Sequence, residues 1–332
     1  MWEQDLTQPR LLSEREESQE RLLRPQNFSE FEGQEEVVAN LKMYIEAARQ
    51  RGEAMDHVLL SGMPGLGKTT LASLIAKEMG VNFWVTSGPV LEAPRDLIGL
   101  LTKLGRADVL FIDEIHRLHP KLEEYLYAAM EDFAVDILID KGPNARSVRV
   151  PLPPFTLVGA TTREGLLSEP FRARFGVLEK LKPYEPQALA RIVRRSAEKL
   201  GIRITEEAAL LLGSRARGTP RIANRFLRRI RDLAQVKGKD VIDGELVRRG
   251  LSRLGVDENG LDPTDRRILR LVAEQGGRPV GLKTIAVAIG EEERTIEDVY
   301  EPYLIQQGLL VKTPRGRVVT PRGLKVIATW QD

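Results

Sequence analysis

The sequence predicts an α/β domain followed by a helical domain and a winged-helix domain. Between Leu22 and Tyr184, short apolar runs typical of buried strands alternate with stretches of helical pattern. Residues 187–254 have a helical pattern without a clear strand, and residues 264–319 have the pattern of three helices and a β-ribbon. Together these observations indicate two or three domains, which 332 residues are enough to form.

The first domain is expected to contain a parallel sheet covered by helices. The runs "HVLLSG" (57–62), "VLFIDE" (109–114) and "FTLVGATT" (155–162) are short and apolar, as expected of strands buried on both faces. The segments "GKTTLASLIAKEMG" and "LEEYLYAAMEDF" are predicted helices. Residues 1–20 are acidic and low in apolar residues, which predicts a mobile leader. Two breaks, "KPYEP" and "GVDENGLDP", then predict domains at 21–184, 185–255 and 256–332.

Composition excludes several kinds of protein and site. The chain has no cysteine, so it can form neither disulfides nor thiolate metal sites. Its three histidines are too few for most imidazole metal centres. It contains no apolar run of 18 residues and no secretory signal pattern at its N-terminus, so we expect no membrane contact and a cytoplasmic location.

Charge is unevenly distributed along the chain. The net charge is only +2, but residues 1–40 hold 4 Lys and Arg against 10 Asp and Glu, whereas residues 185–255 hold 17 against 8. The basic middle segment suggests an anionic partner or ligand. The same arginines could instead form helix faces exposed to water, and charge alone leaves both readings open.

The segment "GMPGLGKTT" (62–70) matches a phosphate-binding P-loop between a strand and a helix. Gly62 and Gly67 permit the tight turn, and Gly65 lets backbone N–H groups approach phosphate oxygens. Lys68 supplies a positive charge, and Thr69 offers a hydroxyl to Mg²⁺. The alternative, a glycine-rich turn before an ordinary helix, is much less compatible with this spacing. The segment therefore predicts a site for ATP and Mg²⁺.

An acidic pair at the end of "VLFIDEIHRL" (109–118) is expected to complete the hydrolytic site. Parallel strands bind ligands at their carboxyl ends, where Asp113 can hold Mg²⁺ through water. Glu114 can orient and deprotonate the attacking water. The alternative is a plain acidic pair between strand and loop. His116 and His119 lack a carboxylate at ligand spacing, so we expect His116 to pack near the nucleotide.

Two further candidates follow the predicted strand at 155–162. The hydroxyl of Thr161 in the Thr161–Thr162 pair could reach the γ-phosphate or the attacking water, or it could cap a turn. Arg174, in the turn "SEPFRARFG" (168–176), lies too far along the chain to assign to its own phosphate site. An arginine donated to a neighbouring subunit would stabilise charge in the transition state, whereas the alternative is a surface ion pair.

The basic segment "RGTPRIANRFLRRIRDLAQ" (217–235) predicts an amphipathic helix. Thr219 can cap it, Pro220 suits its first position, and Arg221 then projects from its first turn. An arginine at a helix start opposes the helix dipole, so an anionic partner there would compensate it.

These elements together resemble an AAA+ ATPase, and the chain is similar to the RuvB family of hexameric motors for Holliday-junction branch migration. The resemblance covers about residues 20–330. Further segments that carry it are "LLRPQNFSEFEGQ", "TSGPVLE", "YAAMEDF", "ARSVRVPLPPFTLVGATTR", "RARGTPRIANR" and "TIEDVYEPYLIQQGLL". It implies an ATP hydrolase that acts on four-way DNA junctions with RuvA, and with RuvC in the resolving complex, in recombination and repair.

The resemblance also implies roles for individual residues and for one hairpin. Residues 135–152 would protrude to bind RuvA, and alternating apolar residues independently support a hairpin, although a plain sheet extension is possible. The residues implied at the nucleotide are Leu23, Arg24 and Tyr184 for adenine and ribose, Gly65, Lys68, Thr69 and Thr70 for phosphates and Mg²⁺, Glu131, Asp132 and Phe133 close by, Arg174 as the finger inserted into a neighbour's site, and Arg221 as the lid sensor.

Two positions depart from the family pattern. Met63 stands where the family commonly has proline, which removes no phosphate ligand. The family often reads Gly-Glu-Glu-Arg before the last long helix, whereas here Glu293 precedes Arg294, which moves the arginine by one place. A DNA contact at Arg294 is therefore open. We assign no role to the acidic leader.

The expected winged helix has an acidic third helix. Helix three would ordinarily read the major groove, but its region carries six carboxylates, which repel phosphates. We therefore expect the ribbon to contact the DNA backbone through Lys312, Arg315 and Arg317, without reading sequence. The alternative is a hairpin that only completes the small core.

Three functions remain compatible with the residues alone. The first is an ATP-driven DNA translocase that works as a ring. The second is a nucleotide-switched DNA-binding protein with slow turnover, and the acidic third helix argues against it. The third is a protein remodeller whose ribbon packs on its own core.

Overall fold

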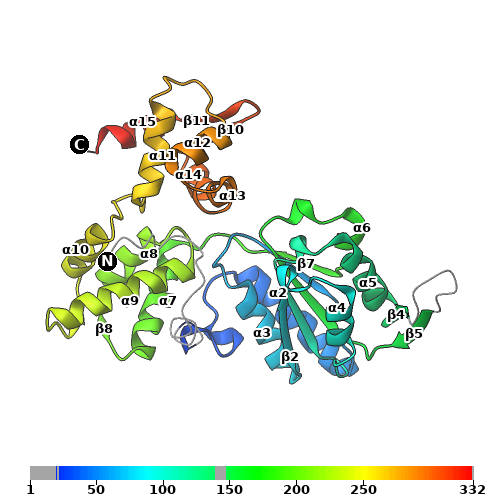
Figure 1. Ribbon diagram of the computed structural model, residues 1–332. Helices are drawn as coiled ribbons and strands as arrows, with labels where there is room; N and C mark the ends of the chain where they lie inside the picture. Colours follow the sequence, from blue (N-terminus) through cyan, green and yellow to red (C-terminus); the bar gives the residue numbers. More distant parts are fainter. Residues whose placement is uncertain (1–19, 21, 139–146, 331–332) are drawn as a thin grey trace. The chain divides into compact units, whose positions relative to one another are not determined.

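The computed structural model describes residues 20, 22–138 and 147–330 (Figure 1). The chain divides into two compact units. One unit is Leu23–Tyr184, and the other comprises Glu185–Asp332 together with the N-terminal residues. Each unit is described separately below. The predicted leader at 1–20 lies, except for Glu20, outside the described residues.

A five-stranded parallel sheet forms the centre of the first unit, as predicted. Its strand order is β2-β3-β6-β1-β7, and every neighbouring pair is parallel. The strands are β1 (Val58–Ser61), β2 (Phe83–Ser87), β3 (Val109–Asp113), β6 (Thr156–Thr161) and β7 (Val177–Lys180). All residues of β1 and β6 are buried, because helices cover both faces of the sheet (Figure 1).

Helices connect these strands and bury their apolar sides against the sheet. Leu97, Leu122 and Leu126 are among the residues that pack with the strands in one apolar cluster. The α-helices are α2 (Glu35–Arg51), α3 (Lys68–Met79), α4 (Pro94–Leu101), α5 (Pro120–Glu131) and α6 (Glu169–Arg172), and the short 3-10 helices are η1 (Phe28–Glu30), η2 (Gly88–Val90), η3 (Ile115–Arg117) and η4 (Glu164–Leu166).

An antiparallel hairpin extends the first unit between α5 and β6. Its strands are β4 (Ala134–Leu138) and β5 (Ser147–Pro151), with Val135 opposite Val150 and Ile137 opposite Val148. This register agrees with the predicted hairpin at 135–152. The turn of that hairpin, residues 139–146, lies outside the described residues.

Helices dominate the segment that follows Tyr184. They are α7 (Pro186–Lys199), α8 (Glu206–Arg215), α9 (Pro220–Val236) and α10 (Gly244–Arg253). The expectation of no strand is wrong in detail, because β8 (Arg203–Ile204) pairs in parallel with β9 (Val241–Ile242). Two residues are too few to give a periodic pattern in the sequence. Thr219 is at the N-cap position of α9, but its hydroxyl donates to the carbonyl of Ala216 and accepts no hydrogen bond from the backbone N–H groups of the helix.

The C-terminal segment is a winged helix, as predicted. Its helices are α11 (Pro263–Ala273), α12 (Leu282–Ile289), a third that joins α13 (Glu293–Thr295), the π-helical η5 (Ile296–Tyr300) and α14 (Glu301–Gln306), and finally α15 (Pro321–Ala328). The wing is β10 (Leu310–Thr313) paired with β11 (Gly316–Val319). A bridge between Val280 and Arg317 ties the wing to the segment before α12. No helix in the described ranges is both long enough and apolar enough to cross a membrane.

Candidate nucleotide and DNA sites

The P-loop lies between β1 and α3 and has the backbone geometry of a phosphate cradle. Gly62, Gly65 and Gly67 have φ values of 143°, 81° and 105°, which L-residues with a Cβ adopt only with strain. A Cβ at Gly62 would also lie 2.8 Å from the carbonyl oxygen of Leu181. Helix α3 begins at Lys68, so its free N–H groups face the loop. These features favour an anion at this edge of the sheet.

Lys68 is buried at the start of α3, and its ammonium group lies inside the loop. Its Nζ donates hydrogen bonds to the carbonyl oxygens of Gly62 at 2.7 Å and Met63 at 2.9 Å. Burial lowers the pKa of Lys68 to about 8, although the carboxylates of Asp113 and Glu114 oppose this shift. An incoming phosphate would supply the negative charge that this lysine lacks.

The acidic pair follows β3 at the same edge of the sheet. Asp113 ends β3, and its Oδ1 accepts a hydrogen bond from the backbone N–H of Glu114 at 2.9 Å. Glu114 has a φ of 47°, a costly value for a residue with a side chain, and strain of this kind is concentrated at functional sites. Its carboxylate accepts a hydrogen bond from Arg117 at 2.8 Å. Arg117 was not among the residues predicted to lie at this site.

The hydroxyl of Thr161 is engaged inside the protein. Thr161 is 1% exposed, and its Oγ1 lies 3.0 Å from Nδ1 of His116 and accepts a hydrogen bond from the backbone N–H of Arg163 at 3.0 Å. This geometry favours the capping alternative for Thr161 and assigns His116 to hold it. Thr162 is less deeply buried and directly follows β6, so it is the better candidate to reach a phosphate.

Tyr184 packs beside the P-loop, where it was expected to border the adenine. Its hydroxyl donates a hydrogen bond to the carbonyl of Leu66 at 3.0 Å, and its ring leaves no room for a Cβ at Gly33. Leu23 is buried, whereas Arg24 is partly exposed. Tyr184 therefore connects the end of the first unit directly to the phosphate loop.

Another set of expected nucleotide residues lies at the opposite edge of the sheet. The ring of Phe133 lies 6.2 Å from that of His57, which precedes β1, whereas the P-loop follows β1. Glu131 pairs with Arg174 at 2.8 Å, and Asp132 pairs with Arg149. Glu131, Asp132 and Phe133 therefore lie away from the chain's own P-loop, because β1 separates them from it. Their expected place close to a nucleotide stays a prediction, which only the site of another molecule could meet.

Arg174 is exposed at this same opposite edge. It follows α6, and its guanidinium lies 5.4 Å from the ring centre of Tyr127 in addition to its pair with Glu131. A stacked and paired arginine has a defined direction although it is accessible. Arg174 therefore does not reach the P-loop of its own chain.

Arg221 lies in the first turn of α9, as expected. It is 3.8 Å from the carboxylate of Glu20 and is not fully exposed. Its position at a helix start agrees with a role toward an anion, but both residues of this pair belong to the second unit.

One prediction for the wing is wrong, the accessible position of Arg317. Arg317 is 7% exposed, and its guanidinium makes two hydrogen bonds to Glu301, one of them 3.0 Å long. It therefore cannot serve as a free phosphate contact. Lys312 is exposed but pairs with Glu297 at 2.9 Å, and Arg294 pairs with Asp298 at 3.4 Å. Carboxylates of the third helix thus neutralise two of the three predicted cations of the wing, Lys312 and Arg317.

Arg315 is the exposed residue of the wing that remains a candidate for contact with DNA phosphates. It lies at the exposed turn between β10 and β11. The turn is fixed, because Gly316 has a φ of 141° and a Cβ there would lie 2.4 Å from the carbonyl oxygen of Val280. The wing therefore presents Arg315 from a rigid support.

The residues at the P-loop edge suit a hard cation better than a transition-metal cluster. In the part of the chain that the structure describes, no group of three or more histidine or carboxylate side chains could hold a metal ion alone. Thr69 and Asp113 contribute oxygen atoms, which Mg²⁺ prefers, and Mg²⁺ commonly completes its coordination with phosphate oxygens and water.

Comparison with known proteins agrees with this geometry along the whole chain. Residues 23–181 match the Holliday junction DNA helicase RuvB P-loop domain, residues 184–257 the RuvB AAA lid domain, and residues 258–328 the RuvB C-terminal winged helix domain. The chain is 57% identical over 307 residues to a Holliday junction branch migration complex subunit RuvB from Flavobacterium psychrophilum, covering 92% of this chain and 90% of the relative. The corresponding Myxococcus xanthus protein is 58% identical over 301 residues, covering 90% and 88%.

A solved structure leads to the same family. It is described as the Thermotoga maritima RuvB Holliday junction branch migration motor and superposes with a TM-score of 0.85 at 47% identity, covering 94% of this chain and 100% of that one. Sequence motifs, fold and site geometry agree with these matches over all three domains. The chain belongs to the RuvB family of AAA+ ATPases.

Proposed function

We propose that this chain is the ATP-hydrolysing subunit of a ring that drives branch migration of four-way DNA junctions. The observation that carries the proposal is the separation of two groups of residues on one sheet. The P-loop, Asp113 and Glu114 lie at one edge, and Arg174 lies exposed at the other. The relatives named above are branch migration subunits, and this chain has the same three domains.

Hydrolysis would use the groups at the P-loop edge. The glycines and the N-terminus of α3 would bind the phosphates of ATP, and Lys68 would neutralise part of their charge. Thr69 and Asp113 would hold Mg²⁺, which polarises the phosphates when bound. Glu114 would orient and deprotonate the attacking water after its carboxylate leaves Arg117. Thr162, beside the buried Thr161, would contact the terminal phosphate.

Arg174 would complete the site of a neighbouring subunit. Since the P-loop and Arg174 lie at opposite edges, repeated contacts would be head-to-tail, and such contacts form a closed ring when the rotation closes. We assign six subunits to the ring from the family resemblance. Glu131 and Asp132 would then approach the neighbour's nucleotide together with Arg174.

The hairpin β4–β5 is the proposed docking element for RuvA. It projects from the first unit beyond α5, and its exposed Val148 offers an apolar contact (Figure 1). We also propose that the chain works with RuvC in the resolving complex and that it is located in the cytoplasm. Both proposals rest on the family resemblance.

The winged helix would hold the DNA backbone through Arg315. Lys312 and Arg294 are exposed and could exchange their carboxylate partners for phosphates, whereas Arg317 has a structural role. Contacts to phosphate carry no direct sequence information, which suits a motor that passes along any sequence.

The proposal is tested by measuring ATPase rate and junction migration with and without DNA and RuvA. We expect DNA and RuvA to stimulate the ATPase, and we expect migration to need both of them. In Arg315→Ala, DNA affinity should fall and the salt slope should become shallower by about one. An ATPase rate that does not change when DNA and RuvA are added would contradict the motor proposal and favour a protein remodeller. A salt slope of DNA binding that does not change in Arg315→Ala would show that Arg315 does not contact DNA.

A further inference from the structure

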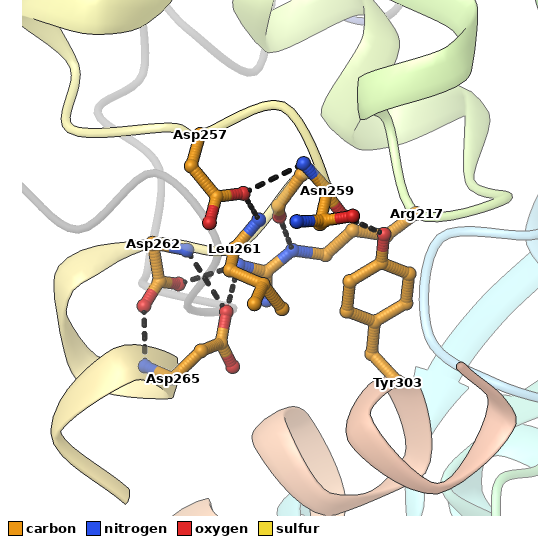
Figure 2. A network of polar contacts seen from close by, with 8 residues as sticks. Arg217, Asp257, Asn259, Leu261, Asp262, Asp265 and Tyr303 are labelled. Carbon is orange, nitrogen blue, oxygen red and sulfur yellow. Dashed lines mark hydrogen bonds and ion pairs between the residues drawn. The ribbon is translucent and has the colours of Figure 1, made fainter. Parts of the chain in front are cut away.

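A buried arginine joins the helical lid to the winged helix (Figure 2). Arg217 follows α8, but its side chain reaches the segment that precedes α11. Its Nε donates a hydrogen bond to the carbonyl of Gly260 at 3.0 Å, and its Nη2 donates to Asp262 at 2.7 Å and also to Asp265. Arg217 and both aspartates are buried, with Asp265 0% exposed. One side chain of the lid therefore has three partners outside it.

The two aspartates also begin the first helix of the winged helix. The backbone N–H of Asp265 donates to Asp262 at 2.8 Å, and the N–H of Asp262 donates to Asp265 at 3.0 Å. This reciprocal arrangement is a capping box at the start of α11. Arg217 thus holds the carboxylates that fix where α11 starts, so a movement of the lid acts directly on that helix.

Tyr303 on α14 closes the network from the third helix of the winged helix. Its ring centre lies 5.0 Å from Cζ of Arg217, and its hydroxyl donates to the carbonyl of Asn259 at 2.6 Å (Figure 2). Gly260 has a φ of 71°, and a Cβ there would lie 3.0 Å from the carbonyl oxygen of Arg215. The predicted linker at 255–263 is therefore packed against both domains and is no free tether.

The charges of the network keep it ionised. Burial alone would lower the pKa of Arg217, but the carboxylates of Asp265 and Asp262 raise it above its ordinary value. Burial raises the pKa of Tyr303 to about 12, so its hydroxyl stays protonated. Removing one partner of such a buried set leaves the others uncompensated, so breaking the connection costs free energy.

The backbone of Arg217 connects this network to the proposed nucleotide sensor. Arg217 and Gly218 have φ values of 55° and 69°, and Thr219 donates its backbone N–H to the carbonyl of Ala216 at 3.0 Å. This turn starts α9 at Pro220, and Arg221 follows in the first helical turn. The residue that holds the winged helix therefore also lies in the turn that leads into the helix carrying Arg221.

We propose that Arg217 is a positioning residue that couples Arg221 to the winged helix, so that the lid and the DNA-holding domain move together when nucleotide is hydrolysed. The network is continuous through side chains and backbone, which gives a physical route for coupling. The inference rests on the proposed function, in which the winged helix holds DNA, and on the role of nucleotide sensor that the family resemblance implies for Arg221.

The test is the number of base pairs migrated per ATP hydrolysed, with RuvA and saturating junction DNA. In Arg217→Met this ratio should fall by about fivefold or more, because hydrolysis no longer moves the winged helix. ATPase without DNA and affinity for DNA should stay close to wild type. An unchanged ratio, with migration and ATPase lowered in parallel, would mean that Arg217 is only structural and would overturn the proposal.

Arg317→Met is the matched control, since it also removes a buried arginine from a carboxylate but inside the winged helix alone. It should lower thermal stability and leave the ratio unchanged at saturating DNA. Arg217→Lys should restore part of the ratio. If Arg217→Met does not fold, Tyr303→Phe removes only the hydroxyl bond to Asn259 and should lower the ratio less; no fall there overturns the proposal.

Measurements on the wild-type protein test the proposed function separately from the coupling proposal. If wild type shows neither DNA-stimulated ATPase nor migration, there is no motor, and the coupling proposal falls with it. If wild type shows both and the ratio of every Arg217 and Tyr303 variant equals that of wild type, only the coupling proposal is overturned.

Discussion

The two edges of the central sheet carry different kinds of polar group. At the carboxyl ends of the strands, the P-loop and Lys68 are held by short contacts within the chain, and Asp113 is bonded to the backbone. At the opposite edge, Glu131 and Arg174 are exposed and are held by each other. Inward contacts suit a site that binds its own ligand, and outward charges suit a site that serves another molecule.

Under the proposed function, this difference means that one chain holds all the groups but not a complete site. β1 begins beside His57 at one edge and leads into the P-loop at the other, so the sheet itself separates Arg174 from Lys68. No side-chain movement brings them together. In the proposed ring, assembly of copies unites the two halves.

Arg174→Ala should have the largest effect. ATPase of the assembled protein should fall by about a thousandfold, because a trans-acting arginine stabilises charge in the transition state. ATP affinity of the isolated chain should not change, since Arg174 lies away from its own P-loop. The neighbouring Arg172→Ala, which removes only a pair with Glu164 at 3.9 Å, serves as control and should keep nearly full activity. Loss of ATP binding in isolated Arg174→Ala chains would contradict the separation.

Glu114→Gln should lower the hydrolysis rate by about a hundredfold or more and leave ATP binding intact, because the amide cannot accept the proton of water. Single-turnover hydrolysis and equilibrium binding are the two measurements. Glu124→Gln changes an exposed carboxylate of α5 in the same way and should have no effect. Retained hydrolysis in Glu114→Gln would remove Glu114 from the role of base.

ATP affinity should fall as pH rises above about 8. In the free chain burial lowers the pKa of Lys68 to about 8, and bound phosphate would raise it, so binding takes up a proton above this pH. Affinity should decrease by up to about tenfold per pH unit up to the raised pKa, as measured by calorimetry in two buffers. In Lys68→Arg the guanidinium stays charged and the slope should disappear, and a slope that persists there would assign it to another group.

Asp108→Asn should have the smallest effect, on stability alone. Asp108 lies at the edge opposite the P-loop, where it accepts hydrogen bonds from the backbone of Gly105 at 2.8 Å and from Trp84 at 2.9 Å. Burial opposes its ionisation, but these bonds and those of Asn82 lower its pKa below 3.8. We expect a loss of about 2 kcal/mol in the free energy of unfolding.

The pH dependence gives the control for Asp108. Because its folded pKa is lowered, its contribution is present above the unfolded pKa and is lost as pH falls through the folded value. The difference in unfolding free energy between wild type and Asp108→Asn should therefore shrink below about pH 4. A difference that is constant through this range would show that the charge of Asp108 is not involved.

The sequence predicted features that depend on residues close together in the chain. It did not predict features that depend on contacts between residues far apart in the chain. The P-loop, the β3 end and the hairpin are contiguous patterns, and all three were placed correctly. The family resemblance placed Glu131 to Phe133 at a nucleotide without saying in which subunit. They lie at the end of α5, which leads from the carboxyl end of β3 back toward the amino end of β6, so they lie away from the chain's own P-loop. Arg317 was expected at the surface, because its burial depends on Glu301, 16 residues earlier.

Two other misses have similar causes. Choosing between Thr161 and Thr162 requires knowing which hydroxyl His116 holds, and that contact spans 45 residues. Arg217 was visible only as part of a basic segment, since its partners lie 43 to 48 residues further along. The aspartates at 262 and 265 have the spacing of a capping box, which suggests that they could bind a cation. The sequence does not say which arginine they bind.

The most direct test of the divided site is to mix two inactive variants, Glu114→Gln and Arg174→Ala, and to measure ATPase after confirming that mixed rings form. An interface with the P-loop of one variant and the arginine of the other is intact. Random mixing of equal amounts should therefore restore activity at about one quarter of the interfaces. If mixed rings stay as inactive as either variant alone, Arg174 does not act on its neighbour's nucleotide, and the account is contradicted.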